Sequence, residues 1–218
     1  KQSRKKLVAD YGVESKKIVV IPHGTPDLPL TITDRYKKNK GLGNRFVLGN
    51  VNLISENKGL EYIIKAIAKI VPKIPEVLYL AIGQTHPGVL AETGEKYRSF
   101  LKKEVRKLGI QKNIKFVNKY QSLQNLVTWL QTIDIYITPY LDPQQSSSGA
   151  LAYAIGAGKV CISTHYLYAQ ETLTGNRGIL VPFRDSSSLA KAIIYLWENP
   201  TKRQQMAKRT YKYGRFMT

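Results

Sequence analysis

Short, continuous runs of β-branched and other apolar residues alternate along the chain with segments of helical periodicity. Strands that are buried on both faces, as in a parallel sheet, read as such continuous runs. The runs lie at 46–51, 77–82, 114–117, 133–138, 160–163 and 178–181. The alternation predicts an α/β fold, namely a Rossmann-like doubly wound parallel sheet of about six strands with helices on both faces.

Amphipathic segments fill the intervals between these runs. Apolar residues from Leu60 to Val71 recur at helical spacing, and Pro72 ends that helix. Further helices are expected at about 95–108, 123–130, 148–156, 187–198 and 202–213. The segment 25–44 is rich in Pro, Gly and Lys, which predicts an exposed loop or linker.

The net charge is the unusual bulk property. The chain has 34 Lys+Arg against 15 Asp+Glu, a formal net charge of +19. Three interpretations stay open: a solvated basic face, attraction to an anionic membrane surface or substrate, and binding of nucleic acid. The basic residues are spread over several segments, so nucleic acid is the least favoured partner. No apolar run approaches the roughly 18 residues of a membrane span.

The loops that follow the strands are the places to search for chemistry, because ligands of doubly wound sheets lie at the carboxyl ends of the strands. One such loop, 142–149, opens directly into a helix. Its small residues allow close approach, and unpaired amides at a helix start attract an anion. A plain serine cap is the alternative interpretation. The candidate phosphate contacts are Ser147, Ser148, Gly149 and Ala150.

Lys58 is a second candidate, and it stands just before the start of a helix. A cation at this end interacts unfavourably with the helix dipole unless an anion binds nearby, so an anion is the expected ligand. Two further loops belong to the same edge of the sheet. One contains Gly83 and His86, and the imidazole could donate to a phosphate or a sugar hydroxyl. The other contains Lys119 and Tyr120, whose ring could flank a base. Incidental exposure is the alternative for both side chains.

Several kinds of site are not indicated. No Cys/His cluster has metal-ligand spacing, and the three histidines stand far apart at 23, 86 and 165. There is no G-x-G-x-x-G, Walker-type lysine loop or nucleophile elbow. The single cysteine, Cys161, lies in an apolar stretch and is expected to be a buried thiol. We therefore expect no metal and no cofactor.

Taken together, these segments resemble a known family. The parts that carry the resemblance are the Ile-Pro-His-Gly turn in 18–24, Lys58-Gly59, the strand 134–139, the passage 154–164 and the closing segment 175–182. They occur in the order found in the C-terminal domain of GT-B-fold retaining glycosyltransferases of family 4, the glycosyl transferases group 1. The resemblance covers nearly the whole chain.

The resemblance implies retaining, hexosyltransferase-type transfer from a nucleoside-diphosphate sugar without a metal. It implies that Lys58 and the amides of 147–150 stabilise the departing diphosphate. It also implies that the chain has four parts. These are a helix and interdomain strand in 1–24, an exposed loop or linker in 25–44, a Rossmann-like nucleotide-sugar-binding domain in 45–200 and a truncated C-terminal crossover helix in 201–218. An N-terminal acceptor domain, absent from this sequence, would complete the enzyme, so the chain alone is expected to be inactive.

The sequence departs from the family at three positions. Gln145 and Tyr153 stand where the family usually has two glutamates, and Leu53 stands near its usual arginine. We interpret this as a subgroup variation and keep Gln145 and Tyr153 as donor contacts. The resemblance further implies a bacterial, cytoplasmic enzyme, with the inner membrane face as a further location. The alternative from another class is a non-catalytic basic module that binds an anionic membrane or nucleic acid.

Overall fold

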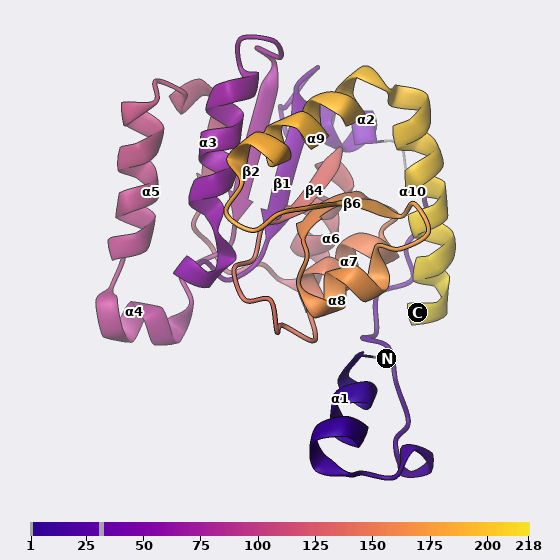
Figure 1. Ribbon diagram of the computed structural model, residues 1–218. Coiled ribbons are helices and arrows are strands. Elements are labelled where there is room, and N and C mark those ends of the chain that lie inside the picture. Colours follow the sequence, from indigo (N-terminus) through magenta and orange to yellow (C-terminus); the bar gives the residue numbers. More distant parts are fainter. Residues whose placement is uncertain (1, 31–32) are drawn as a thin grey trace.

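The computed structural model describes residues 2–30 and 33–218 (Figure 1). The strands are β1 (Phe46–Val51), β2 (Val77–Ile82), β3 (Ile114–Val117), β4 (Ile135–Thr138), β5 (Val160–Thr164) and β6 (Gly178–Val181). The helices are α1 (Gln2–Tyr11), α2 (Thr33–Asn39), α3 (Leu60–Ile70), α4 (Pro87–Thr93), α5 (Lys96–Lys107), α6 (Leu123–Thr132), α7 (Gly149–Gly156), α8 (Leu167–Thr172), α9 (Ser186–Glu198) and α10 (Pro200–Gly214).

The six strands form one parallel sheet in the order β3-β2-β1-β4-β5-β6. The sequence order reverses between β1 and β4, which is the switch point of a doubly wound fold. The predicted fold class is therefore confirmed. Two small differences concern strand ends. β4 begins later than expected because the Ile133 amide closes α6 on the Leu130 carbonyl at 3.2 Å, and β5 runs one residue further to Thr164.

Alternate strand residues point to opposite faces and build two apolar clusters. One lies under α3, α5 and α9, and includes Leu48, Tyr79 and Ile162. The other lies under α6, α7 and α8, and includes Val47, Tyr136 and Cys161. Cys161 is a free, buried thiol as expected, and burial raises its pKa. Among the described residues, no helix is both long enough and apolar enough to cross a lipid bilayer.

The segment 25–44 is not a loop throughout, which corrects that prediction. Residues 33–39 form α2, which packs beside α6. The helix is held by tertiary contacts: Lys37 Nζ lies 2.7 Å from Asp134 Oδ2, and Thr33 Oγ1 donates to Asp134 Oδ1 at 3.0 Å. The composition of residues 25–44 could not predict this helix, because the carboxylate that holds it, Asp134, lies far along the chain.

The expected strand within 18–24 is also not formed. Residues 18–30 have no helix or strand, because no neighbouring strand pairs with them. Val19 and Ile21 are 81% and 82% exposed. The preceding helix, α1, lies beyond the end of the sheet and beside α8, where Lys6 Nζ donates to Gln144 Oε1 at 3.2 Å (Figure 1).

Candidate functional site

A cavity of about 460 Å³ lies at the carboxyl ends of β1 and β4. Eight of the residues singled out from the sequence line it together: Lys58, His86, Gln145, Ser147, Ser148, Gly149, Ala150 and Tyr153. The other lining residues are His23, Val51, Asn52, Leu53, Leu126 and Tyr140. None of these described side chains is a carboxylate, so the lining suits an anion.

The start of α7 forms one wall. Ser148 is the N-cap, and its hydroxyl accepts a hydrogen bond from the Leu151 amide at 3.2 Å. Gln145 Nε2 donates to the Ser147 carbonyl at 3.0 Å and so braces the turn before the helix. The first amides of a helix have no partner within the helix and carry its positive dipole end. This wall therefore presents amide donors to the cavity.

The ring of His23 packs against Gly149. A Cβ at 149 would lie 2.8 Å from Nε2 of His23, so the imidazole would have to move to accept a larger residue. His23 also meets Tyr153 edge to face, with 5.7 Å between the ring centroids. His23 therefore lies directly over the start of α7, and glycine at 149 leaves room for its ring.

Lys58 forms the opposite wall. Its Nζ lies 4.2 Å from the centre of the Tyr140 ring, a cation–π contact. Burial lowers the pKa of Lys58, and the charge of Asp142 opposes that shift. Among the described residues, Lys58 makes no ion pair. A partly buried ammonium with an aromatic support and no paired carboxylate is suited to hold a phosphate.

Gly59 fixes the position of this lysine. It has a φ of 63°, and a Cβ would lie 2.3 Å from the Pro139 carbonyl oxygen. The Leu141 amide donates to the Asn57 carbonyl at 2.9 Å. The turn before α3 is therefore fastened to the segment that follows β4, which keeps Lys58 beside the loop leading to α7.

His86 has a defined hydrogen-bonding role. Its Nδ1 accepts from the Gly88 amide at 3.1 Å and caps α4, a helix that the sequence analysis did not expect. In the neutral ring, this leaves Nε2 as the protonated nitrogen. His86 can thus offer a donor to the cavity while capping its own helix.

Three predicted residues lie outside the cavity: Gly83, Lys119 and Tyr120. Tyr120 is 69% exposed, and Lys119 is exposed as well. Gly83 has a packing role instead. Its φ is 132°, and a Cβ would lie 1.9 Å from the Asn52 carbonyl oxygen, so glycine lets the chain leaving β2 pass beside the chain leaving β1.

Three polar residues of the cavity were not predicted from the sequence: His23, Asn52 and Tyr140. Asn52 and Tyr140 follow β1 and β4, so the rule that placed the other candidates could have found them. Asn52 Nδ2 donates to Tyr140 Oη at 3.4 Å, while its buried Oδ1 has no partner among the described residues. His23 arrives from a segment remote in sequence, and only the fold brings it to α7.

Metal chemistry is not indicated at this edge. Within residues 2–30 and 33–218, no three His, Cys, Asp or Glu side chains are grouped so that they could hold a metal ion. The polar groups of the cavity are an ammonium, imidazoles, amides and hydroxyls. They can bind an anion and donate to hydroxyl groups.

Comparisons with known proteins identify the family and the fold. The sequence profile of the family described as glycosyl transferases group 1 matches residues 32–213. The search of curated proteins found no match. The crystal structure of the C-terminal domain of LpcC, a glycosyl transferase group 1 family protein from Francisella tularensis, is 19% identical and has a TM-score of 0.74. The alignment covers 86% of this chain and 93% of that one.

Two longer structures are also similar. Anabaena Alr3699/HepE in complex with UDP and glucose is 19% identical, with a TM-score of 0.80 over 97% of this chain and 55% of that one. WaaG, a glycosyltransferase involved in lipopolysaccharide biosynthesis, is 20% identical, with a TM-score of 0.77 over 96% and 55%. The chain thus spans about half the length of these two proteins. It belongs to the glycosyl transferases group 1 family, as the resemblance predicted, and has the fold of that family's C-terminal, GT-B-type domain.

Proposed function

We propose that this chain is the donor-binding half of a glycosyltransferase and that the cavity at the carboxyl edge holds the diphosphate of a nucleoside-diphosphate sugar. The observation that carries the proposal is the meeting of the α7 amides, Lys58 and His86 in one cavity without a lining carboxylate. HepE, whose structure was determined with UDP-glucose, has the same fold. That likeness supports a sugar nucleotide as the ligand to test first.

In the proposed reaction, negative charge grows on the diphosphate as the sugar leaves. Lys58 and the amides of Ser148, Gly149 and Ala150 stabilise that charge, because donors fixed in advance need no reorganisation. Each hydrogen bond to a charged group contributes about 1.5–3 kcal/mol. Gln145 and Tyr153 replace the carboxylates usual in the family, so the ribose and the sugar are held by neutral groups.

The acceptor side of the enzyme belongs to a second, N-terminal domain in this proposal. The exposed apolar residues Val19 and Ile21 lie in the segment that leads to the sheet, where a partner domain would cover them. We therefore expect transfer only when both domains are present. A bacterial, cytoplasmic enzyme and contact of its basic surface with an anionic membrane remain predictions of this proposal, and binding of nucleic acid is not favoured.

Calorimetric titration of the intact protein with UDP-, GDP- and ADP-sugars tests the proposal. We expect one base to bind saturably, and Lys58→Met to weaken binding of that sugar nucleotide about tenfold, since a lost charged contact costs at least 1.4 kcal/mol. Lys65→Met is the matched control, because Lys65 is exposed on α3, the helix that follows Lys58, and lies outside the cavity. If no sugar nucleotide binds, or if both variants bind like the parent, the proposal is wrong.

A further inference from the structure

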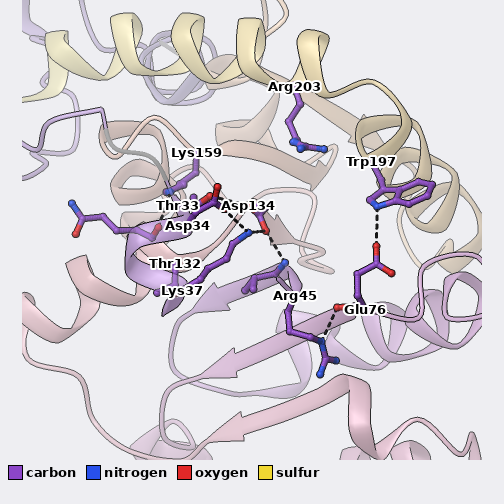
Figure 2. A network of polar contacts seen from close by, with 12 residues as sticks. Thr33, Asp34, Lys37, Arg45, Glu76, Thr132, Asp134, Lys159, Trp197 and Arg203 are labelled. Atoms are coloured by element: carbon purple, nitrogen blue, oxygen red, sulfur yellow. Dashed lines mark hydrogen bonds and ion pairs between the residues drawn. The ribbon is translucent and has the colours of Figure 1, made fainter. Parts of the chain in front are cut away.

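A second and larger cavity, about 590 Å³, lies at the opposite edge of the sheet, where β1, β4 and β5 begin. Ligands of doubly wound folds lie at the carboxyl edge, so the family's donor site does not account for it. Its walls come from α2, α9 and α10 and from the strand starts. Figure 2 shows the polar residues that meet there.

Charged side chains dominate this amino-edge cavity. Five cations and three carboxylates line it, which leaves an excess of positive charge. One carboxylate, Asp134, is already neutralised: it accepts from Lys37 Nζ at 2.7 Å, Thr33 Oγ1 at 3.0 Å and the Val47 amide at 2.7 Å. A second, Asp34, has an 82% exposed side chain and contributes little inside the cavity.

Lys159 is the buried cation that this network leaves unpaired. It is 5% exposed, and its Nζ donates to the Gln131 carbonyl over a long 3.4 Å. No carboxylate of the described residues pairs with it. An ammonium has three donors, so most of its hydrogen-bonding capacity is unused. Burial lowers the pKa of Lys159 to about 8, with Asp134 opposing and Lys37 reinforcing that shift.

Arg203 is a second cation without an acid partner among the described residues. Its Nη1 donates to the Leu196 carbonyl at 2.7 Å, and its guanidinium lies 5.3 Å from the centre of the Phe46 ring. In Figure 2 the side chain points from α10 toward the space shared with Lys159 and Asp134. Arg45 differs, because its donors are bound to the carbonyls of Glu76, Val77 and Lys112 and it serves the backbone.

The rest of the lining suits an organic anion with hydroxyl groups. Trp197 and Phe46 provide apolar surface. Glu76 Oε1 accepts a hydrogen bond from Trp197 Nε1 at 3.3 Å, and the other carboxylate oxygen of Glu76 can accept from a hydroxyl of the ligand. The volume lies within the range of small-molecule sites, about 300–1,000 Å³. An arginine with a lysine is the usual pair for a phosphate group.

We propose that the amino-edge cavity binds a small phosphate monoester, with Lys159 and Arg203 on the phosphate and Glu76 toward the hydroxyl groups. A bound dianion would supply the hydrogen-bond acceptors that Lys159 lacks and would offset the cost of burying its charge. The site is separate from the proposed nucleotide cavity, since the two lie at opposite ends of the strands and share no lining residue.

The test uses ribose 5-phosphate, inorganic phosphate and uncharged ribose as probes, titrated into the intact protein at constant ionic strength and followed by calorimetry. We expect saturable binding of the monoester and none of ribose. Lys159→Met and Arg203→Met should each weaken binding of the monoester at least tenfold. Arg209→Met is the matched control, because Arg209 is exposed on the same helix and outside the cavity.

Circular dichroism and a parallel titration with the sugar nucleotide show whether each variant is folded. The proposal is overturned if ribose 5-phosphate does not bind the parent protein. It is also overturned if Arg203→Met and Lys159→Met, both folded, bind the monoester as tightly as Arg209→Met does. Because the sugar nucleotide is measured separately, failure here leaves the donor-site proposal untouched.

Discussion

The two edges of one sheet hold two cavities whose positive charge has different sources. At the carboxyl edge, positive potential comes from helix amides and one lysine, and no described carboxylate lines the cavity. At the amino edge, lysines, arginines and carboxylates share a mixed network with a buried ion pair. The carboxyl edge has few opposing charges and can respond to charge that develops in a reaction. At the amino edge, most of the charges stabilise the fold, and only the excess positive charge is available to a ligand.

The comparison separates two kinds of importance. The paired residues of the amino edge, Lys37 and Asp134, should affect mainly the free energy of unfolding, because their charges already meet within the protein. Residues at the carboxyl edge should affect mainly ligand affinity and turnover, since the groups they bind belong to the ligand and not to the protein. Substitutions of single residues can test this division.

Asp134→Ala should be the most damaging. It leaves the buried ammonium of Lys37 with only the exposed carboxylate of Asp34, and it removes the acceptor of the Val47 amide. Breaking a buried pair in this way costs about 3–5 kcal/mol of the free energy of unfolding, measured by urea denaturation. Asp34→Ala, which removes an exposed carboxylate 3.5 Å from the same lysine, should change it by less than about 0.5 kcal/mol. Equal losses would show that the buried network is not the support we infer.

Gly59→Ala should come next. A positive φ costs a non-glycine residue about 1–3 kcal/mol, and here the new Cβ would also meet the Pro139 carbonyl oxygen. We expect a loss above about 2 kcal/mol in urea denaturation, with weaker nucleotide binding, because Lys58 would be displaced. Gly109→Ala is the control, with a φ of 68° and open space at its Cβ. Its loss should be smaller and its nucleotide affinity unchanged; the reverse ranking would refute the steric argument.

Lys58→Ala should affect the reaction more than the fold. In the complete enzyme, turnover at saturating donor should fall tenfold or more, since about 1.4 kcal/mol of transition-state stabilisation is a tenfold change in rate. The free energy of unfolding should change little, because the lysine has no ion-pair partner among the described residues. Unchanged turnover at saturating donor would remove Lys58 from the proposed mechanism.

Ser148→Ala and Ser122→Ala form a matched pair with the smallest effect. Both serines are N-caps, of α7 and α6, and each accepts from an amide in the first turn of its helix. Each substitution should cost about 1 kcal/mol of the free energy of unfolding. Only Ser148→Ala should also weaken nucleotide binding, because Ser148 lines the cavity and Ser122 does not. Equal affinities for the two variants would contradict a ligand at the start of α7.

The sheet could be predicted from the sequence because each buried strand is a continuous apolar run, as in Val77–Ile82. The carboxyl-edge cavity could be predicted in part because its residues follow strands directly. Gly83 belonged to the same pattern, yet it serves chain packing. The rule finds the correct edge of the sheet, but it does not say which side chains face the ligand.

The amino edge could not be predicted in this way. Lys37 belongs to a segment whose composition favours a loop, and its partner Asp134 lies far along the chain. Lys159 follows Gly158 in a passage that matched the family, with no local sign that its amine would be buried without a paired acid. Tertiary ion pairs and buried charges depend on which segments meet in space, and the local pattern carries no record of that.

The backbone amides of the protein, followed by NMR during titration with the nucleoside diphosphate of the preferred donor, show where the ligand binds. We expect the largest shifts at Ser147, Ser148, Gly149 and Ala150, while amides 157–160 at the amino edge stay unchanged. Saturable shifts confined to the amino edge, or none at the start of α7, would contradict a donor site at the carboxyl edge.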